Sequence, residues 1–437
     1  MMKVTLGSLP QIARDRIAED SMLRNSSYMM ASTVLTSLMG YVFWLVVAHT
    51  ASTADIGVGA ATTSAMQATA LIASVGAATA MVEWLPRTLT VDRWRRILTA
   101  AVTVVIVTAV AGSAVVILAL GYVLDTLPSL STAVAAAAFT MGATFFALGT
   151  LADCVAVALR RSGLLLARNM LFTALRIPLL FIPVLIRGTH NQILTAWSAS
   201  AVISVVFSTF WCRRIRGEHS MRPLFGHLVS DVRDMSASLL GQHVVTVAAS
   251  VTSFVLPIIV LARLSESDGA YFYATWMLGA VFFMISPCIA MALFAETATD
   301  PEDIPALARR CSRIIAALLG PLILVYLICG GWALRVFGES YSAHGKTLLI
   351  VLTLSAVPDA VTNIAVAVLR AVGRLREAMT LNVSMLLACL ALSWILLPFM
   401  GIVAVGISWL AAQSLGALWA LARWRYIIVP TQQRALR

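Results

Sequence analysis

The sequence predicts an all-α integral membrane protein in which about twelve transmembrane helices form two pseudo-symmetric six-helix bundles. Three observations lead to this prediction. Hydrophobic residues make up 60% of the 437 positions and charged residues only 12%, with a mean hydropathy of +0.90, which excludes a soluble globular protein. Apolar stretches of membrane-spanning length recur along the whole chain. The two halves of the sequence also resemble each other.

Twelve apolar stretches come close to or exceed the roughly 20 residues that a helix needs to cross a bilayer. In the first half they occupy 27–50, 56–84, 97–122, 131–159, 164–186 and 190–212. In the second half they occupy 236–262, 269–296, 314–336, 344–370, 376–399 and 401–423. Twelve such helices leave too few residues for a folded domain outside the membrane.

Polar segments divide the chain into five parts. Residues 1–26 form a polar, amphipathic segment that lacks the features of a cleavable signal peptide. The first bundle follows at 27–212, and the longest polar interruption, 213–235, links it to the second bundle at 236–423. Residues 424–437 then form a short tail.

Arginines gather in every second break between the apolar stretches. Positive residues are retained on the cytoplasmic side during insertion, so we assign most of the 31 Lys and Arg to that side, together with both termini. We expect a multi-pass protein of the inner (plasma) membrane. The net charge of +11 then reflects topology and contacts with anionic lipids rather than nucleic-acid binding. The six cysteines suggest neither a disulfide nor a metal cluster.

An internal repeat relates the two halves. Shifting residues 31–62 by 213 positions gives nine identities. The same shift pairs polar and charged residues, which apolar bias cannot explain: Ser52 with Ser265, Asp55 with Asp268, Glu83 with Glu296 and Arg96 with Arg309. Both six-helix units start on the same side, so a pseudo-two-fold axis along the membrane normal should relate them. Such repeats are typical of transporters, whose substrate path lies at the repeat interface.

Arg176 is the most informative charged residue, because it falls near the middle of the fifth span. A charge at that depth is costly unless it faces protein or water, so it predicts a functional site. Asn169 lies seven residues earlier on nearly the same face, and Arg168 lies about 12 Å away along the helix. One interpretation is that Arg176 contacts an anion in a central cavity. The other is that it pairs with Asp153 or Asp359 to hold helices together.

Two polar stripes lie in the fourth and tenth spans. Asp153 precedes Arg160 by seven residues, and Asp359, Asn363 and Arg370 occupy positions i, i+4 and i+11. A local shift of 210 residues aligns 159–163 with 369–373 and thereby Asp153 with Asn363. The two aspartates are candidates for a protonation or ion site. The alternative is that Pro358 kinks its helix and the Asp359 carboxylate bonds to the freed backbone.

Two glutamates occupy corresponding positions at the cytoplasmic ends of the second and eighth spans. Glu83 is followed by Arg87, and Glu296 precedes Arg309. Carboxylates that bridge to basic residues across the inner mouth would form a gate. Solvated helix ends would explain the same residues equally well.

Three short segments resemble the polysaccharide-flippase (Wzx-type) branch of the MOP exporter superfamily, whose relatives include MATE drug exporters and the lipid II flippase. They lie at 74–87 (SVGAATAMVEWLPR), 336–345 (VFGESYSAHG) and 397–406 (LPFMGIVAVG). Together with the helix count and the two halves, the resemblance covers essentially the whole chain. It implies a V-shaped pair of six-helix bundles around a central, often cationic cavity. Arg168 and Arg176 fall where such a cavity could be lined.

The resemblance implies a flippase that moves a polyprenyl-(pyro)phosphate-linked oligosaccharide from the inner to the outer leaflet by alternating access. Guanidinium groups suit this task, because they bind phosphate bidentately and stay charged when desolvated. The alternative is a MATE-like, ion-coupled exporter of small molecules. We expect no enzymatic activity and no cofactor apart from possible coupling to H⁺ or Na⁺. Expected partners are the glycan lipid, anionic membrane lipids and glycan assembly or polymerase proteins.

Overall fold

The computed structural model describes residues 11–74, 77, 81, 84–88, 90–123, 126–182, 189–216, 222–297 and 304–427, although some of their side chains are not described. Regular structure in these ranges is helical, without β-strands. In the first half the main helices are α1 (Gln11–Thr50), α2 (Thr53–Ala73), α4 (Val91–Val116), α5 (Ala133–Ala158), α6 (Ser162–Leu180) and α7 (Thr189–Arg216). Short turns η2 (Leu85–Arg87), η3 (Ile117–Val123) and η4 (Pro128–Ser131) join them.

The second half starts inside the predicted linker, because α8 spans Leu228–Ser250. The helices that follow are α9 (Thr252–Arg263), α10 (Glu266–Gly279), α11 (Phe282–Thr297), α12 (Ile304–Arg335), α13 (Glu339–Ala371), α14 (Leu375–Met400), α15 (Val403–Ala422) and α16 (Trp424–Ile427). At the other end of the chain, α1 is already helical from Gln11, so its length of 40 residues exceeds the predicted first span.

Ten helices of the described chain are long and apolar enough to cross a membrane, and the number rises to twelve when two bent helix pairs each count as one span. The bent pairs are α8–α9 and α10–α11, and each bends by 42°. The protein is therefore a multi-pass membrane protein with the predicted all-α fold.

Prolines account for the two bends. Val251 separates α8 from α9 six residues before Pro257, and Val281 follows α10 six residues before Pro287. Proline cannot donate a backbone hydrogen bond and its ring crowds the preceding turn, so helices bend just before it. In the first half, α1 runs without a break to Thr50. The corresponding spans of the two halves therefore differ in stiffness.

The 213-residue repeat is confirmed by the helix boundaries. α2 begins at Thr53 and α10 at Glu266, α4 at Val91 and α12 at Ile304, and α6 at Ser162 and α14 at Leu375. The caps repeat as well, since the side chains of Ser52 and Ser265 accept hydrogen bonds from the backbone N–H groups of Asp55 and Asp268, each at 3.1 Å. Both caps satisfy free N–H groups of a first helical turn.

The predicted local alignment of 159–163 with 369–373 is wrong. The residues that follow the caps of α5 and α13 take the left-handed conformation, and these are Arg160 (φ 54°) and Gly373 (φ 78°). They lie 213 positions apart, not 210. The Leu-Arg pair that both segments share suggested a shift of 210 residues, but the ends of α5 and α13 show that the shift is 213. Asp153 consequently corresponds to Val366, and Asn363 is not its counterpart.

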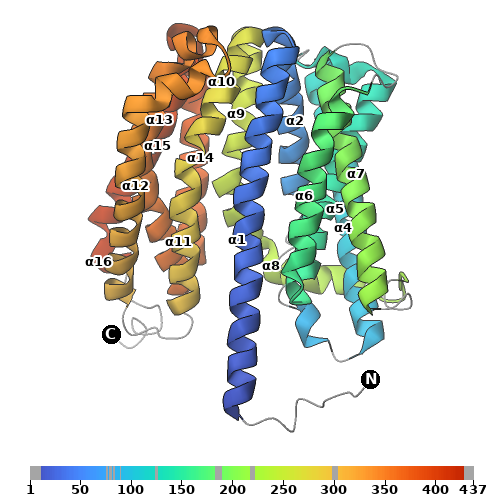
Figure 1. Ribbon diagram of the computed structural model, residues 1–437. Helices are drawn as coiled ribbons and strands as arrows, with labels where there is room; N and C mark the ends of the chain where they lie inside the picture. The colour runs from blue at the N-terminus through green and yellow to red at the C-terminus, as the bar shows by residue number, and fades with distance from the viewer. Residues whose placement is uncertain are drawn as a thin grey trace.

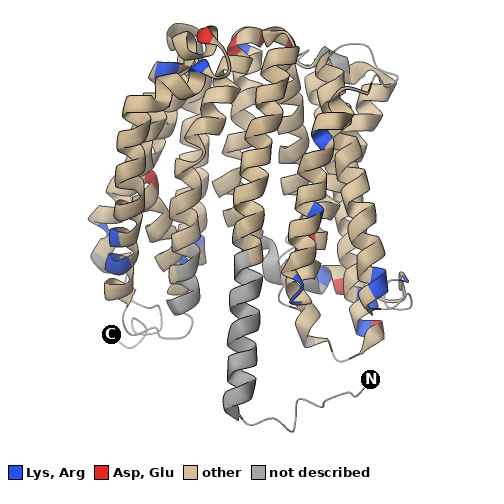
Figure 2. Ribbon diagram, in the orientation of Figure 1, with Lys and Arg blue, Asp and Glu red and all other residues tan. Residues whose placement is uncertain are grey.

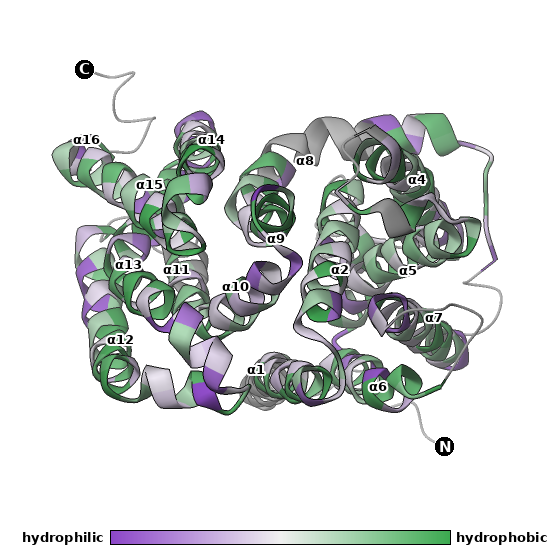
Figure 3. Ribbon diagram, turned by 90° about the horizontal axis from the view of Figure 1, so that it is seen from above, coloured by the Kyte–Doolittle hydropathy of each residue, from purple (hydrophilic) through white to green (hydrophobic). Residues whose placement is uncertain are grey.

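Seen from above, corresponding helices lie on opposite sides of a common centre: α1 and α9, α4 and α12, and α6 and α14 (Figure 3). This arrangement is the predicted pseudo-two-fold symmetry. From the side, the bundles form a V that is narrow where α2 and α10 begin and wide where α4 and α12 begin (Figure 1). We call these the narrow end and the wide end.

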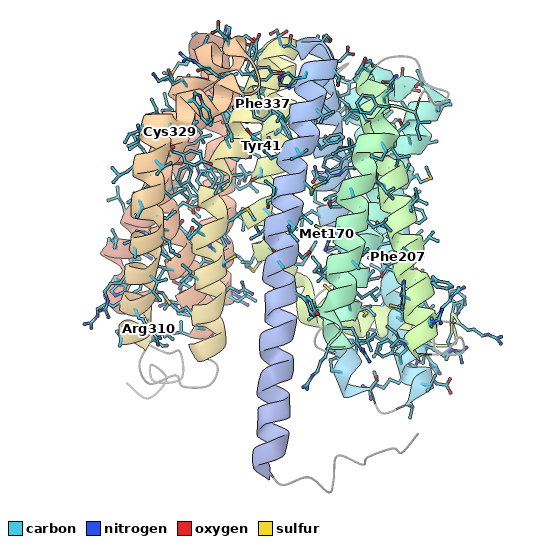
Figure 4. The ribbon with its side chains drawn as sticks, in the orientation of Figure 1. Tyr41, Met170, Phe207, Arg310, Cys329 and Phe337 are labelled. Atoms are coloured by element: carbon cyan, nitrogen blue, oxygen red, sulfur yellow. The ribbon has the colours of Figure 1, made fainter. Side chains whose placement is uncertain are left out.

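Close packing joins the two halves at the narrow end. A Cβ atom built on Gly57 of α2 would lie 1.8 Å from the carbonyl oxygen of Glu266 of α10, so the backbones meet without room for any side chain. Beside them, the hydroxyl groups of Thr53 and Ser267 are 3.0 Å apart. Below these contacts the rings of Tyr41 and Phe337 meet edge to face at 5.1 Å (Figure 4). The narrow end is therefore sealed by direct contact between the bundles.

Basic residues gather at the wide end on both bundles, as Figure 2 shows for the lower ends of the helices. The side chain of Arg310 at the start of α12 marks this end (Figure 4). Cationic loops are typical of the cytoplasmic side, which is the side to which the sequence assigns this end.

Candidate functional site

Arg176 is buried in an aromatic cage formed by Phe43 of α1, Phe172 of α6 and Trp197 of α7. Its guanidinium carbon lies 5.4, 4.7 and 4.3 Å from the three ring centroids, respectively. The residue is only 4% exposed. Each desolvated contact of this kind contributes about 2 kcal/mol, so the rings partly offset the cost of burying the cation.

The cage lies where the two bundles meet. Trp44, next to Phe43 on α1, packs on Tyr273 of α10 with a centroid distance of 4.6 Å. The cage therefore lies beside an aromatic contact between the two halves, below the sealed narrow end. Any motion that separates α10 from α1 would change these surroundings.

The predicted ion pair of Arg176 with Asp153 or Asp359 is wrong. No carboxylate of the described residues lies within ion-pair distance of Arg176, and both aspartates have other partners. The Nε atom of Arg176 is buried without a hydrogen-bond partner. A buried donor left unsatisfied costs about 1–3 kcal/mol. The rings thus stabilise the positive charge of Arg176, while its Nε–H group has no hydrogen-bond acceptor.

Asp153, Arg168 and Asn169 form a closed polar cluster between α5 and α6. Arg168 donates from Nε and Nη2 to the two carboxylate oxygens of Asp153, at 2.7 and 2.5 Å. Asn169 accepts from Arg168 at 2.7 Å and donates to Asp153 at 3.2 Å. Sequence reasoning found all three residues but grouped Asp153 with Arg160 and Arg168 with Arg176. Helix packing instead pairs Asp153 with Arg168, which neutralises both charges.

A second polar cluster lies in the other bundle, around Asp359 of α13. Ser286 of α11 donates to the Asp359 carboxylate at 2.7 Å, and Asn363, one turn along α13, donates to it at 3.0 Å. Asp359 is 4% exposed. The predicted bond of this carboxylate to backbone freed by Pro358 is wrong, because α13 continues through the proline and the carboxylate bonds to side chains. The pairing of Asp359 with Asn363 on one helix face is confirmed.

The predicted gate residues are only partly within the described structure. Glu83 lies outside the described residues, and so do the side chains of Arg87 and Glu296. Arg309 is exposed near the start of α12 at the wide end. The gate therefore stays a prediction.

Sequence reasoning missed the aromatic residues of the cage and Ser286. Phe43 and Trp197 lie on helices far from Arg176 in the sequence, and no fixed spacing relates a cation to rings on other helices. Ser286 looked like an ordinary small residue of an apolar span. Its position next to Pro287, inside α11, was the one available signal. Among the described residues, no group of three or more His, Cys, Asp or Glu could hold a metal ion.

Comparison with known proteins finds matches in structure only. No protein-family model matches the chain, and no curated protein matches it in sequence. An inward-facing multidrug resistance MATE family transporter of the MOP superfamily superimposes with a TM-score of 0.66 at 14% identity, covering 90% of this chain and 94% of that chain. The lipid II flippase MurJ in an inward closed conformation gives 0.73 at 10% identity, covering 91% and 87%. An outward-facing MATE transporter gives 0.60 at 16% identity, covering 93% and 96%.

These likenesses extend over nearly the full length of the chain and confirm the fold. The protein has the V-shaped, two-bundle architecture of MATE transporters and of the lipid II flippase. Of the two MATE structures, the inward-facing one gives the higher TM-score.

Proposed function

We propose that this protein is a flippase that translocates a polyprenyl-(pyro)phosphate-linked oligosaccharide from the inner to the outer leaflet by alternating access. Its two-bundle fold is shared with a lipid flippase and with multidrug transporters. Transport rather than an enzymatic reaction is the activity that such a fold supports. In this proposal the protein lies in the inner (plasma) membrane with its wide end and both termini in the cytoplasm.

The observation that carries the proposal is the unpaired cation at the meeting point of the bundles. Arg168 is neutralised by Asp153 in the first bundle, whereas Arg176 has no carboxylate partner among the described residues. A diphosphate would supply the missing negative charge and the hydrogen-bond acceptors. Arginine suits this role because its guanidinium stays charged and binds phosphate bidentately. Arg176 would then exchange ring contacts for phosphate contacts as the bundles move.

Asp359 is proposed as the site that couples transport to an ion. A buried carboxylate whose described partners are the neutral groups of Ser286 and Asn363 is costly to keep charged. Binding of H⁺ or Na⁺ would remove that cost and could be linked to movement of α11 against α13. No other cofactor is proposed.

The second candidate function is ion-coupled export of small molecules, since one of the structures that superimpose on this chain is a multidrug resistance MATE family transporter. The Asp359 cluster favours it, because such transport needs an ion site. Cationic substrates would, however, meet the unpaired positive charge of Arg176. The caged arginine therefore favours an anionic substrate.

Loss of the gene should make one polyprenyl-linked glycan accumulate on the inner leaflet, and mass spectrometry of extracted lipids would identify it. The purified protein in vesicles should then move that glycan lipid to the opposite leaflet, where an added hydrolase can reach it. Vesicles with an Arg176→Ala variant provide the control. Unchanged glycan lipids in the mutant cells, together with increased sensitivity to cationic drugs, would favour the exporter instead.

A further inference from the structure

A groove of about 440 Å³ lies in the basic half of the first bundle, between α4, α5, α7 and the segment 222–225. It is separate from the aromatic cage and from both polar clusters. From Arg95 near the start of α4 it extends to Ile106, which lies about 16 Å farther along the helix. Seven branched aliphatic side chains contribute to the lining: Leu98, Val102, Ile106, Leu148, Leu151, Val155 and Val205.

The groove borders the surface that faces lipid. On α4, Val107 and Val110 are 60% and 46% exposed, and on α7, Val206 and Phe210 are 59% and 58% exposed. Large apolar side chains at such exposure belong against hydrocarbon in a membrane protein. An acyl chain can therefore enter the groove without crossing a polar surface.

The mouth of the groove is built by two specific bonds. The Nε atom of Arg95 donates to the carbonyl oxygen of Arg222 at 2.9 Å. The backbone N–H of Leu224 donates to the hydroxyl of Thr99 at 3.0 Å. These bonds hold the segment 222–225 against α4, so that Pro223 and Phe225 complete the wall.

Positive charge is concentrated at this mouth. Arg95, Arg213 and Arg222 line it, and the lining includes no acidic residue. Asp92 pairs with Arg95 at 3.1 Å, but its side chain is 74% exposed. The other two arginines are exposed at the wide end of the molecule. A groove with an aliphatic lining and guanidinium groups at its mouth is complementary to a phospholipid, whose acyl chain is apolar and whose headgroup is anionic.

We propose that this groove binds an anionic phospholipid of the leaflet at the wide end. One acyl chain lies along α4 toward Ile106, and the headgroup phosphate contacts Arg213 and Arg222 beside Arg95. The bound lipid would hold the segment 222–225 on α4, next to the point where α8 joins the first bundle. This proposal depends on the protein spanning a membrane and not on which substrate it moves.

Native mass spectrometry of the purified protein would test the site. Titration with phosphatidylglycerol should show one retained lipid with about tenfold or higher preference over phosphatidylcholine. The double variant Arg213→Gln/Arg222→Gln should lose that preference. The matched control is Arg310→Gln/Arg313→Gln, which removes two exposed arginines near the start of α12, at the same end of the molecule. It should bind as the wild type does.

A second variant blocks the groove rather than its charge. Thr209→Trp places a bulky ring in the lining and should reduce retention of the lipid. If the Thr209→Trp variant fails to fold, the Arg213→Gln/Arg222→Gln variant still tests the proposal. Equal binding of both lipids by the wild type would overturn the proposal. Equal losses of the preference for phosphatidylglycerol in the Arg213→Gln/Arg222→Gln variant and in its control would also overturn the proposal. Displacement of phosphatidylglycerol by a polyprenyl phosphate would overturn it in favour of a site for the substrate tail.

Discussion

Arg96 of α4 donates two hydrogen bonds to the carboxylate of Asp231 of α8, from Nε at 3.0 Å and from Nη2 at 2.6 Å. The pair is 135 residues apart in the sequence and joins the first bundle to the start of the second half. It fixes the beginning of α8 to α4, whereas α9 packs beyond the bend at Val251 with the helices near the centre. The bend can then act as a hinge when the bundles move.

Breaking this ion pair should impair transport. Arg96→Gln or Asp231→Asn leaves one charge without its partner and frees the start of α8, so each single variant should transport more slowly. The swapped variant Arg96→Asp/Asp231→Arg restores the charge complementarity and should recover part of the activity. Transport rates of the wild type, Arg96→Gln, Asp231→Asn and the double variant Arg96→Gln/Asp231→Asn form a double-mutant cycle. Additive single effects would mean that the pair does not act as a unit.

Replacement of Arg176 should affect transport more than folding. Removing a charge-assisted contact costs about 1.5–3 kcal/mol, so Arg176→Ala should lower affinity for the substrate roughly ten- to a hundredfold. Arg176→Lys should recover only part of it, because ammonium lacks the bidentate geometry. Arg263→Ala is the matched control, since Arg263 stacks on Trp394 at 4.6 Å outside the cage. Normal transport by Arg176→Ala would refute the anion site.

Replacement of Asp359 should uncouple transport from its ion. Asp359→Asn keeps the shape and removes the buried charge, so the melting temperature should stay the same or rise. Transport should lose its dependence on the H⁺ or Na⁺ gradient. Asp92→Asn, whose carboxylate is 74% exposed, is the control. The coupling role fails if collapse of both gradients leaves wild-type transport unchanged.

A side chain at position 57 should prevent the narrow end from closing. In Gly57→Ala the new Cβ would meet the Glu266 carbonyl at 1.8 Å, and backbone cannot yield as a flexible side chain would. Cysteines placed at Thr53 and Ser267 in a cysteine-free background should cross-link readily, and Gly57→Ala should reduce the yield in monodisperse protein. Gly40→Ala, which meets nothing within 4 Å, should leave it unchanged. An unchanged yield with Gly57→Ala would contradict a tight seal.

Reporter fusions should establish the orientation. The asymmetric distribution of arginine predicts that fusions after Arg216 and after Arg437 report cytoplasm. A fusion after Gly338, at the narrow end before α13, should report the outside. A cytoplasmic signal from the Gly338 fusion, or an external signal from the Arg216 or Arg437 fusion, would contradict the proposal that the wide end faces the cytoplasm.

Sequence reasoning predicted the features that depend on regular patterns. Apolar length predicted the spans, and identities such as Ser52 with Ser265 predicted a repeat of 213 residues, which the starts of α2, α4 and α6 and of α10, α12 and α14 confirm. It could not predict which side chains meet between helices. One of the two interpretations of Arg176 paired it with a carboxylate, whereas helix packing surrounds it with aromatic rings. The bends at Val251 and Val281 were also missed, since mean hydropathy does not register a break of one or two residues.

The equal spacing of the helix starts has a practical consequence for labelling this protein. No residue has been gained or lost between the start of α2 and that of α6 relative to α10 and α14, although the halves share few side chains. The combined length of helices and loops has thus been kept although single loops differ, since α5 starts at Ala133 and α13 at Glu339, only 206 positions later. A tag inserted within either half should therefore disturb how neighbouring spans align. The segment between α7 and α8 has no counterpart inside either repeat. Fluorophores or affinity epitopes are best inserted there between Arg216 and Arg222, because residues 222–225 complete the wall of the groove on α4.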